Sequence, residues 1–330
     1  SLIISILSFF NIIYSYYFNL YLNIDSYIYS LIISLFLGMF FLLNKTKEKK
    51  ISIYSKIVTV FIGYLLLPLI ISVPYYFSIY NISFLDCYFE SVSGFTSTGF
   101  TIFSNIKHID QSLILWRSSS QWVGGLYFLF SIILLIDIFD NNFKKSLTNF
   151  ISFNTSEVFK QSLKILILYS GLTFFIFIIL NLIDIRIFNS FNIAMTIISS
   201  GGFLPVNNLS SILDSNFKEV VFSLLMLSSF FSLFLTYNLI FITKKNINFF
   251  QEDIYLLIYL IFLLVIFYLF FNFDYNFSKI FLSLASSISN IGISLNTTNK
   301  DLSFIFLILV MIGGSFFSTS SGIRFLKLYS

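Results

Sequence analysis

Residues 84–101 of the chain read FLDCYFESVSGFTSTGFT, a short amphipathic stretch that ends in hydroxyl-bearing residues and a glycine. The same order returns at residues 188–203, which read FNSFNIAMTIISSGGF, and at residues 277–294, which read FSKIFLSLASSISNIGIS. Each copy ends near a glycine, and these glycines recur about every hundred residues, at Gly99, Gly202 and Gly292. We therefore expect three copies of one structural unit.

The segments that flank these stretches are long and apolar. The chain has 330 residues, of which 57% are hydrophobic and only 10% are charged, whereas a soluble domain carries about 25% charged residues. This composition excludes a soluble globular enzyme and indicates a protein that uses lipid as its solvent. A helix needs about 20 apolar residues to cross a bilayer, and eight segments approach or exceed that length: 2–21, 26–43, 56–79, 112–136, 162–183, 217–243, 253–273 and 302–328.

Each repeated stretch lies between two of these predicted spans and is too short to cross a membrane itself. Residues 84–95, 188–198 and 277–288 are therefore predicted to be half-helices that enter the membrane and end inside it. The C-terminal end of such a helix carries about half a negative charge, which favours a cation. The glycine that follows allows a left-handed backbone, so that successive carbonyl groups can point the same way.

These loops predict an ion pathway that needs no charged side chain. Rings of backbone carbonyls can replace the hydration shell of potassium, and irregular backbone at membrane depth occurs where it lines a wet cavity or is buried in protein. The alternative is that the small Ser and Gly residues only let helices pack closely. Three copies at the same place in the same unit favour the ion pathway.

Five segments carry a resemblance to a known family. The stretch FESVSGFTSTGF at residues 89–100 resembles the first filter in the membrane subunit of the Trk/Ktr/HKT superfamily of potassium transporters. The stretch LWRSSSQWVGG at 115–125 is similar to the start of the helix after that filter. ISSGGF at 198–203 and SNIGIS at 289–294 occupy the second and third filters, and MIGGSFFSTSSGIR at 311–324 resembles the broken helix of the third repeat.

The repeat and the resemblance together predict three groups of site residues. The expected potassium selectivity filter consists of Thr96, Ser97, Thr98, Gly99, Phe100, Ser200, Gly201, Gly202, Phe203, Asn290, Ile291, Gly292 and Ile293. The expected gating loop contains Gly313, Gly314, Ser315, Ser318, Thr319, Ser320, Ser321 and Gly322, and its alternative is a Ser-rich helix that bonds its own carbonyls. Glu90 and Arg117 are expected to brace the first filter, although Arg117 could instead pair with Asp110 or extend to the membrane interface.

The resemblance implies an all-α polytopic membrane protein related to the Trk branch, with a four-repeat, potassium-channel-like architecture. We expect an N-terminal helix pair at residues 1–44 and three span–pore helix–span repeats at 56–137, 160–244 and 252–330. No fourth filter is present in these 330 residues. We therefore expect either a truncated chain or a split gene.

The implied function is potassium uptake across a bacterial inner membrane. If the N-terminus is cytoplasmic, thirteen of the 19 Lys and Arg residues lie on the inner side, as the positive-inside rule requires. The third filter departs from the family's pattern, since it has Asn290 where Ser or Thr is commoner, and three alternatives stay open. The chain could be a sodium-permeable cation transporter, a potassium-translocating ATPase subunit or a non-transporting fragment.

Catalysis is not expected from this sequence. The single His108 has no Ser partner indicated, and the single Cys87 offers no metal-ligand spacing, so nucleophilic and metal chemistry both lack their groups. No cofactor is expected, and potassium is the only metal, as the substrate. The resemblance implies a homodimer in the lipid bilayer with a TrkA-like cytoplasmic nucleotide-binding regulatory subunit, and no nucleic acid.

Overall fold

The computed structural model describes residues 1–43, 52–135, 158–234, 236, 250–271, 277–293 and 300–329. Within these ranges the chain forms helices joined by turns, and its one β feature is an isolated bridge between Ile312 and Ile323. The predicted all-α fold is therefore confirmed. The predicted repeat boundaries at residues 44, 137, 244 and 330 lie outside the described residues.

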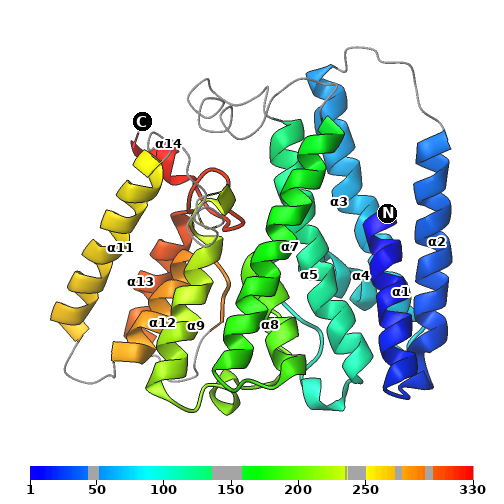
Figure 1. Ribbon diagram of the computed structural model, residues 1–330, viewed down its shortest axis with the longest axis horizontal. Helices are drawn as coiled ribbons and strands as arrows, with labels where there is room; N and C mark the ends of the chain where they lie inside the picture. The colour runs from blue at the N-terminus through cyan, green and yellow to red at the C-terminus, as the bar shows by residue number, and fades with distance from the viewer. Residues whose placement is uncertain are drawn as a thin grey trace.

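The N-terminal helix pair packs through small polar side chains. Helix α1 (Leu2–Tyr17) and helix α2 (Ile24–Leu43) are joined by a short 3-10 turn, η1 (Tyr21–Asn23), and lie against each other (Figure 1). Their buried polar residues recur every three or four residues: Ser5, Ser8, Asn11 and Ser15 on α1, and Ser26, Ser30 and Ser34 on α2. Small residues let helices approach closely in lipid, and the large apolar side chains point outward instead, as Phe9 and Phe36 do.

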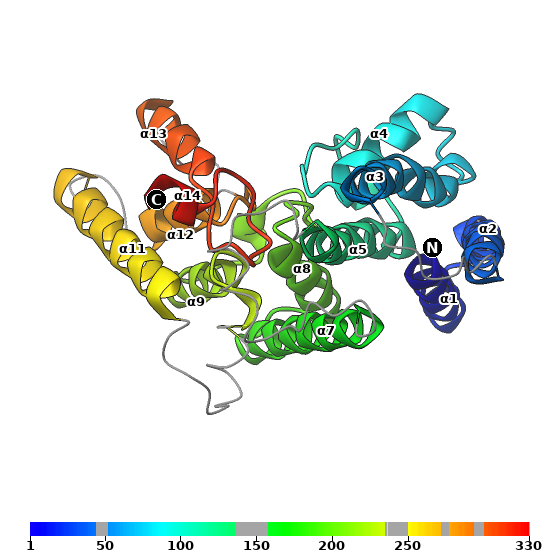
Figure 2. The ribbon, with the colours of Figure 1, turned by 90° about the horizontal axis from the view of Figure 1, so that it is seen from above.

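Three groups of helices follow the pair, and the second helix of each group is one of the predicted half-helices. The first group is α3 (Ile53–Tyr76), α4 (Phe84–Phe95) and α5 (Gln111–Leu134). The second is α7 (Val158–Leu182), α8 (Ile187–Ser199) and α9 (Asn216–Met226). The third is α11 (Phe250–Phe271), α12 (Phe277–Ile288) and α13 (Lys300–Met311), after which α14 (Phe325–Tyr329) follows. Seen from above, the groups follow one another along an arc (Figure 2).

The short helices α4, α8 and α12 agree with the predicted half-helices to within one residue at each end. Helix α4 begins where Ser83 accepts a hydrogen bond from the backbone N–H of Asp86 at 3.2 Å, which is an ordinary N-terminal cap. Helix α4 keeps one face more open, whereas α8 is buried on all sides from Asn192 to Ser199 and α12 is buried on all sides from Ile280 to Ser286. Figure 1 shows α8 and α12 in the lower part of the molecule, among the other helices of their groups.

Two of the predicted spans are not continuous helices. The predicted span 217–243 is wrong as a single helix, because α9 ends at Met226 and a 3-10 turn, η6 (Leu227–Ser229), follows it. The predicted span 302–328 is interrupted after Met311, and residues 312–324 form a loop before α14. The loop was the expected outcome there, and its cause is a run of Gly and Ser residues that favour turns over helix.

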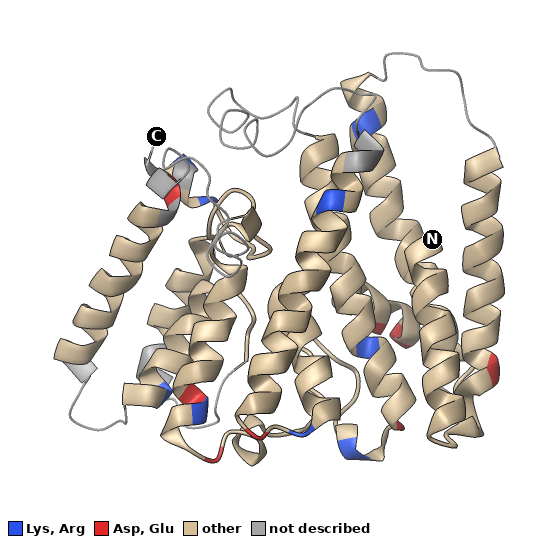
Figure 3. Cartoon of the chain, viewed as in Figure 1, with Lys and Arg blue, Asp and Glu red and all other residues tan. Residues whose placement is uncertain are grey.

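In the described part of the chain, three helices are long and apolar enough to cross a membrane: Tyr21–Leu43, Ile53–Tyr76 and Gln161–Leu182. The composition predicts eight spans. The difference arises because several helices are shorter than their apolar runs, and because α5 carries Arg117 and Gln121 within its length. Most charged residues lie toward the helix ends, and long stretches of the helices carry none (Figure 3).

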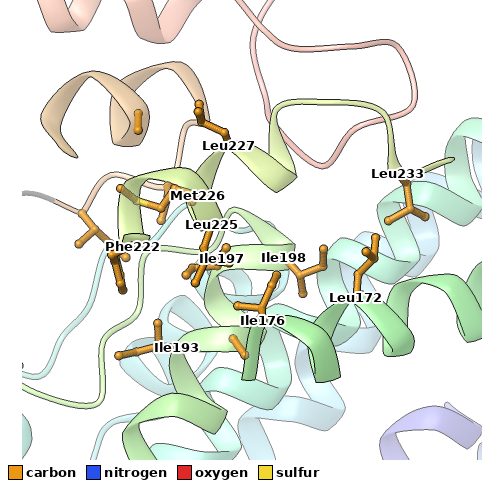
Figure 4. Close-up of a cluster of buried hydrophobic side chains, with 14 of the residues drawn as sticks. Leu172, Ile176, Ile193, Ile197, Ile198, Phe222, Leu225, Met226, Leu227 and Leu233 are labelled. Atoms are coloured by element: carbon orange, nitrogen blue, oxygen red, sulfur yellow. The ribbon is translucent and has the colours of Figure 1, made fainter. Parts of the chain in front are cut away.

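The largest buried cluster joins the second group of helices to its neighbours. It includes Leu172 and Ile176 from α7, Ile193 and Ile197 from α8, and Phe222 from α9 (Figure 4). Helix α8 lies between α5 and α7 and contacts both. In lipid such packing gains little from the hydrophobic effect and depends on close fit and hydrogen bonds. The cluster therefore fixes the position of α8 and the loop that follows it.

Candidate functional site

The three short helices end in the same backbone conformation. One residue at each end is left-handed although it is not glycine: Ser97 has a φ of 55°, Ser200 of 54° and Asn290 of 59°. Two residues later a glycine also has a positive φ, which is 83° at Gly99, 85° at Gly202 and 74° at Gly292. A left-handed conformation costs an L-residue about 1–2 kcal/mol, so the surrounding structure must impose it three times.

The same two hydrogen bonds close each helix end. After α4, the N–H of Ser97 donates to the carbonyl of Gly94 at 3.0 Å, and the N–H of Thr98 donates to Ser93 at 2.9 Å. The equivalent bonds join Ser200 to Ile197 and Gly201 to Thr196 after α8, and Asn290 to Ser287 and Ile291 to Ser286 after α12. This is the Schellman pattern, which turns the chain sharply away from the helix axis.

The first loop contacts the second, and the second contacts the third. A Cβ atom built on Gly99 would lie 2.9 Å from the carbonyl oxygen of Gly201, and one built on Gly202 would lie 2.6 Å from that of Ile291. Real Cβ atoms essentially never come that close to another heavy atom. The residue before each of these two later glycines therefore directs its carbonyl at the preceding loop, and the loops follow one another around a common centre.

A cavity of about 600 Å³ lies where the loops meet. Ten of the predicted filter residues line it: Thr96, Ser97, Thr98, Gly99, Phe100, Ser200, Gly202, Asn290, Ile291 and Gly292. The other three, Gly201, Phe203 and Ile293, are buried. Thr319 and Ser321 of the predicted gating loop line the same cavity. Segments far apart in sequence are thus brought to one place.

Hydroxyl groups on the short helices hold the loops from behind. Ser93 donates to the carbonyl of Phe100 at 2.5 Å, and Thr196 donates to the carbonyl of Phe203 at 2.7 Å. Each hydroxyl lies six residues before its filter glycine, so the bond spans the whole turn. The carbonyl one residue after the glycine is thereby held toward the helix, which limits the freedom of the loop backbone.

A buried glutamine makes three hydrogen bonds around the second loop, and sequence reasoning did not select it as a site residue. Gln121 of α5 is fully buried and donates through Nε2 to the carbonyl of Gly201 at 2.5 Å. Its Oε1 accepts from the N–H of Phe203 at 3.3 Å and, at 3.2 Å, shares the Thr196 hydroxyl proton with the carbonyl of Phe203. The signal was present in the stretch 115–125, since a buried amide in a helix at membrane depth requires partners.

Two adjacent glycines bring α5 against the ends of both neighbouring short helices. A Cβ atom on Gly124 would overlap the backbone of Phe95, at the end of α4. One on Gly125 would lie 3.0 Å from the Cα of Ser199, at the end of α8. Both glycines line the cavity, together with Tyr64 of α3. Helix α5 therefore supports the first and second loops at once.

The structure brings Glu90 and Arg117 together in a buried ion pair. Arg117 Nε lies 2.8 Å from Glu90 Oε1, and the side chains are 1% and 0% exposed. The second carboxylate oxygen accepts from the N–H of Ile102 at 2.9 Å, and Thr101 bridges both side chains. A buried charge needs a partner of this kind, and the pair joins α4 and α5 to the chain after the first loop.

The other partner considered for Arg117 is engaged elsewhere. Asp110 caps α5 by accepting from the N–H of Leu113 at 3.1 Å, and it accepts from Asn23 Nδ2 at 2.8 Å. Arg117 is also buried rather than extended to an interface. Its guanidinium lies 4.2 Å from the ring centroid of Phe203, which follows the second loop, within the range of a cation–π contact. The arginine therefore touches the chain around two of the three loops.

The loop at 312–324 is closed at its neck by backbone bonds. The N–H of Gly313 donates to the carbonyl of Ile323 at 2.8 Å, and the N–H of Ile323 donates to Met311 at 2.9 Å. Inside the loop, Arg324 Nη1 donates to the carbonyls of Ser315 and Ser320 at 3.1 and 2.9 Å and to the Ser318 hydroxyl at 3.0 Å. One guanidinium therefore bonds three oxygens of the loop.

The tip of the loop is anchored in the break after α9. The N–H of Ser315 donates to the carbonyl of Phe230 at 3.0 Å, and the N–H of Ser320 donates to that of Ser229 at 3.1 Å. In the other direction, the N–H of Leu233 donates to the carbonyl of Phe317 at 2.9 Å. The break in the second group thus supplies backbone groups that a continuous helix would have used internally.

No family model matches the chain. It is 26% identical over 297 residues to an uncharacterized cation transporter of Methanocaldococcus jannaschii, an alignment that covers 87% of this chain and 60% of that protein. A shorter match, 40% identical over 60 residues, links it to the Trk system potassium uptake protein TrkI of Halomonas elongata and covers 18% of this chain and 11% of that protein. The chain thus spans about 60% of the length of the archaeal relative.

The fold matches a solved transporter over nearly its whole length. The crystal structure of the potassium transporter TrkH from Vibrio parahaemolyticus superposes with a TM-score of 0.79 and 19% sequence identity. The match covers 99% of this chain and 73% of that one. Together with the sequence matches, it confirms the resemblance to the Trk superfamily and its helical fold. At that identity the structural likeness by itself shows the fold alone.

Proposed function

We propose that this chain lines a membrane pathway for potassium, with the three glycine loops as its selectivity filter. The observation that carries the proposal is the meeting of three identically closed helix ends at one cavity. Each end brings the negative pole of a helix and several backbone carbonyls to the same place, which is a favourable environment for a cation. The names of the Trk relatives support the same ion.

The supporting shell suits a filter that must hold its shape. In the snug-fit account of selectivity, binding of a dehydrated ion depends on carbonyl positions that do not drift. Gln121, Ser93 and Thr196 hold the loops from behind, and the Glu90–Arg117 pair ties the chain after the first loop to two helices. These charged groups are bonded to one another rather than lining the cavity. We therefore assign Glu90 and Arg117 the role of bracing the first filter.

We propose that the loop at 312–324 is the gate. Thr319 and Ser321 line the cavity on the side of this loop, and the loop is held closed by bonds that a modest movement could break one at a time. Deleting residues 315–321 is expected to raise ion flux. Unchanged flux in a well-expressed deletion variant would argue against the gate.

The membrane location, the orientation and the partners of the chain are part of the same proposal. An inner-membrane location with a cytoplasmic N-terminus agrees with the distribution of Lys and Arg along the chain. The resemblance favours a homodimer and a TrkA-like cytoplasmic nucleotide-binding regulatory subunit. Potassium is the substrate, and we assign no cofactor.

A sodium-permeable pathway is the alternative, and it is favoured by one observation. The third loop places Asn290 and Ile291 where the second loop has Ser200 and Gly201, so the ring of side chains around the filter is uneven. An uneven ring could hold the smaller ion as well. Ion competition separates the two candidates.

The experiment is complementation of cells that lack their own potassium uptake systems. The gene that encodes this chain should restore growth at low potassium, and rubidium uptake should be inhibited by potassium but not by sodium. Gly171→Ala is the matched control, because a Cβ atom there meets nothing within 4 Å. Failure of a well-expressed protein to restore growth would contradict transport, and inhibition by sodium would favour the alternative.

A further inference from the structure

The third filter loop is bonded directly to the loop at 312–324. The amide Nδ2 of Asn290 donates to the backbone carbonyl of Ser321 at 3.1 Å. Both residues line the central cavity, so the bond crosses from the proposed filter to the proposed gate. The two segments are 31 residues apart in sequence.

The position of Asn290 is equivalent to that of Ser97 and Ser200. All three are the left-handed residue at the end of a short helix, with φ values between 54° and 59°. A serine side chain is shorter than that of asparagine, and the hydroxyl of Ser200 has no hydrogen-bond partner in the described part of the chain. Asparagine is one of the few residues that tolerate this conformation, and it is also longer and carries a donor.

The acceptor is held in place by the neck of the loop. Ser321 directly precedes Gly322, which has a φ of 89°. The next residue, Ile323, is hydrogen-bonded to Met311 and Gly313 on the opposite side of the neck. A Cβ atom on Gly313 would lie 2.5 Å from the Ser321 carbonyl oxygen, so the two sides of the neck are in close contact. Movement of the loop must therefore displace the Ser321 carbonyl or open the neck.

We propose that Asn290 is a positioning residue that couples the third filter loop to the gating loop. This inference rests on the proposed transport function. In the closed arrangement the bond adds to the interactions that hold the loop beneath the filter, and it also fixes the side chain of the left-handed residue. When the loop moves, the bond breaks and the third filter loop is released with it. Gating and selectivity are thereby linked in this chain.

The simpler alternative is that Asn290 only satisfies the left-handed backbone. Two substitutions separate the alternatives. Asn290→Gly accepts the same φ at no steric cost but removes the amide, and Asn290→Ser places there the residue found at Ser97 and Ser200. Asn81→Gly is the matched control, since Asn81 is another left-handed asparagine, with a φ of 49°, at an exposed position that precedes α4 and does not line the cavity.

The assay is rubidium uptake, with sodium competition, by cells that express the gene. A single net hydrogen bond shifts an equilibrium by a factor of about two to ten, so Asn290→Gly and Asn290→Ser should raise uptake about two- to fivefold and weaken discrimination against sodium. In the variant that lacks residues 315–321, the same substitutions should leave uptake unchanged, because the partner carbonyl is absent. Such non-additivity is the signature of coupling.

Three results would overturn the inference. Uptake by both Asn290 variants that equals that of Asn81→Gly would mean that the amide does nothing beyond the backbone. An increase that persists without residues 315–321 would mean that Asn290 acts independently of the loop. An increase in uptake with unchanged discrimination against sodium would mean that Asn290 does not couple the gating loop to the selectivity of the filter. Absence of uptake by the unsubstituted protein is a different result, which contradicts the proposed function itself.

Discussion

Three glycine-to-alanine substitutions separate the two reasons for glycine in the proposed filter. Gly202 has a φ of 85° and a neighbouring carbonyl oxygen only 2.6 Å from an added Cβ. Gly292 has a φ of 74° but nothing within 4 Å of an added Cβ. Gly171, in α7, has neither constraint. The series therefore varies backbone conformation and contact one at a time.

The magnitudes follow from the geometry. At Gly292→Ala only the left-handed backbone is penalised, at about 1–2 kcal/mol. At Gly202→Ala the same penalty applies, and the Ile291 carbonyl must also move by about 0.4 Å to reach 3.0 Å, the shortest separation that real side chains show. That carbonyl belongs to the third loop, so one substitution disturbs two loops. At Gly171→Ala the helix should gain up to about 1 kcal/mol.

The assay is the ratio of rubidium to sodium uptake in reconstituted vesicles, together with thermal stability in detergent. We expect Gly202→Ala to lower the ratio about tenfold or more, equivalent to about 1.4 kcal/mol of lost discrimination. Gly292→Ala should lower it less, although both lose stability through the backbone penalty. Gly171→Ala should keep the ratio and gain stability. An equal ratio for Gly202→Ala and the unsubstituted protein would refute the argument that contact between loops sets selectivity.

Three further predictions concern the supporting shell. Arg117→Leu leaves the Glu90 carboxylate buried without its partner and should cost about 3–5 kcal/mol, measured as a lower thermal midpoint; Glu90→Met in the same chain should restore part of it, and no recovery would contradict a charge-based explanation. Gln121→Leu strands the Gly201 carbonyl and the Phe203 N–H, so it should cost about 1–3 kcal/mol and lower the rubidium-to-sodium ratio, whereas unchanged ratios would mean that Gln121 only fills space. Arg324→Gln removes the guanidinium that bonds three oxygens of the loop and should raise rubidium uptake severalfold, and lower or equal uptake in a well-folded variant would contradict the role of Arg324 in closure.

The half-helices could be predicted from the sequence because particular residue types mark where they begin and end. Helix α4 begins after Ser83 and ends before a Ser-Thr-Gly turn, and its copies end in the same way. Local signals of that kind survive in any environment. The loop at 312–324 was predictable for the same reason, since its Gly and Ser residues oppose a continuous helix.

The break after α9 could not be predicted, because it depends on a distant segment. Residues 217–243 are apolar enough for one helix, and no Pro or Gly interrupts them. The backbone groups of Ser229, Phe230 and Leu233 bond instead to the loop at 312–324. A tertiary interaction of this kind overrides local propensity, and a single sequence does not display it.

The supporting residues illustrate the same limit. Glu90 and Arg117 could be paired from the sequence, because two charges in an apolar setting need each other and few partners are available. Gln121 and the two glycines at 124 and 125 lie in a recognised stretch, but their roles depend on which atoms face them across the fold. The bond from Asn290 to Ser321 could not be predicted either, because it also depends on which atoms face each other across the fold.

The most direct test of potassium selectivity is rubidium influx into sealed vesicles that contain only the purified protein and lipid. With potassium trapped inside, external rubidium should accumulate, external potassium should inhibit that influx, and a tenfold excess of sodium should leave it nearly unchanged. Gly202→Ala should remove this preference while the protein stays folded. Influx that sodium inhibits as strongly as potassium, or that Gly202→Ala leaves equally selective, would contradict the account of a potassium pathway formed by the three loops.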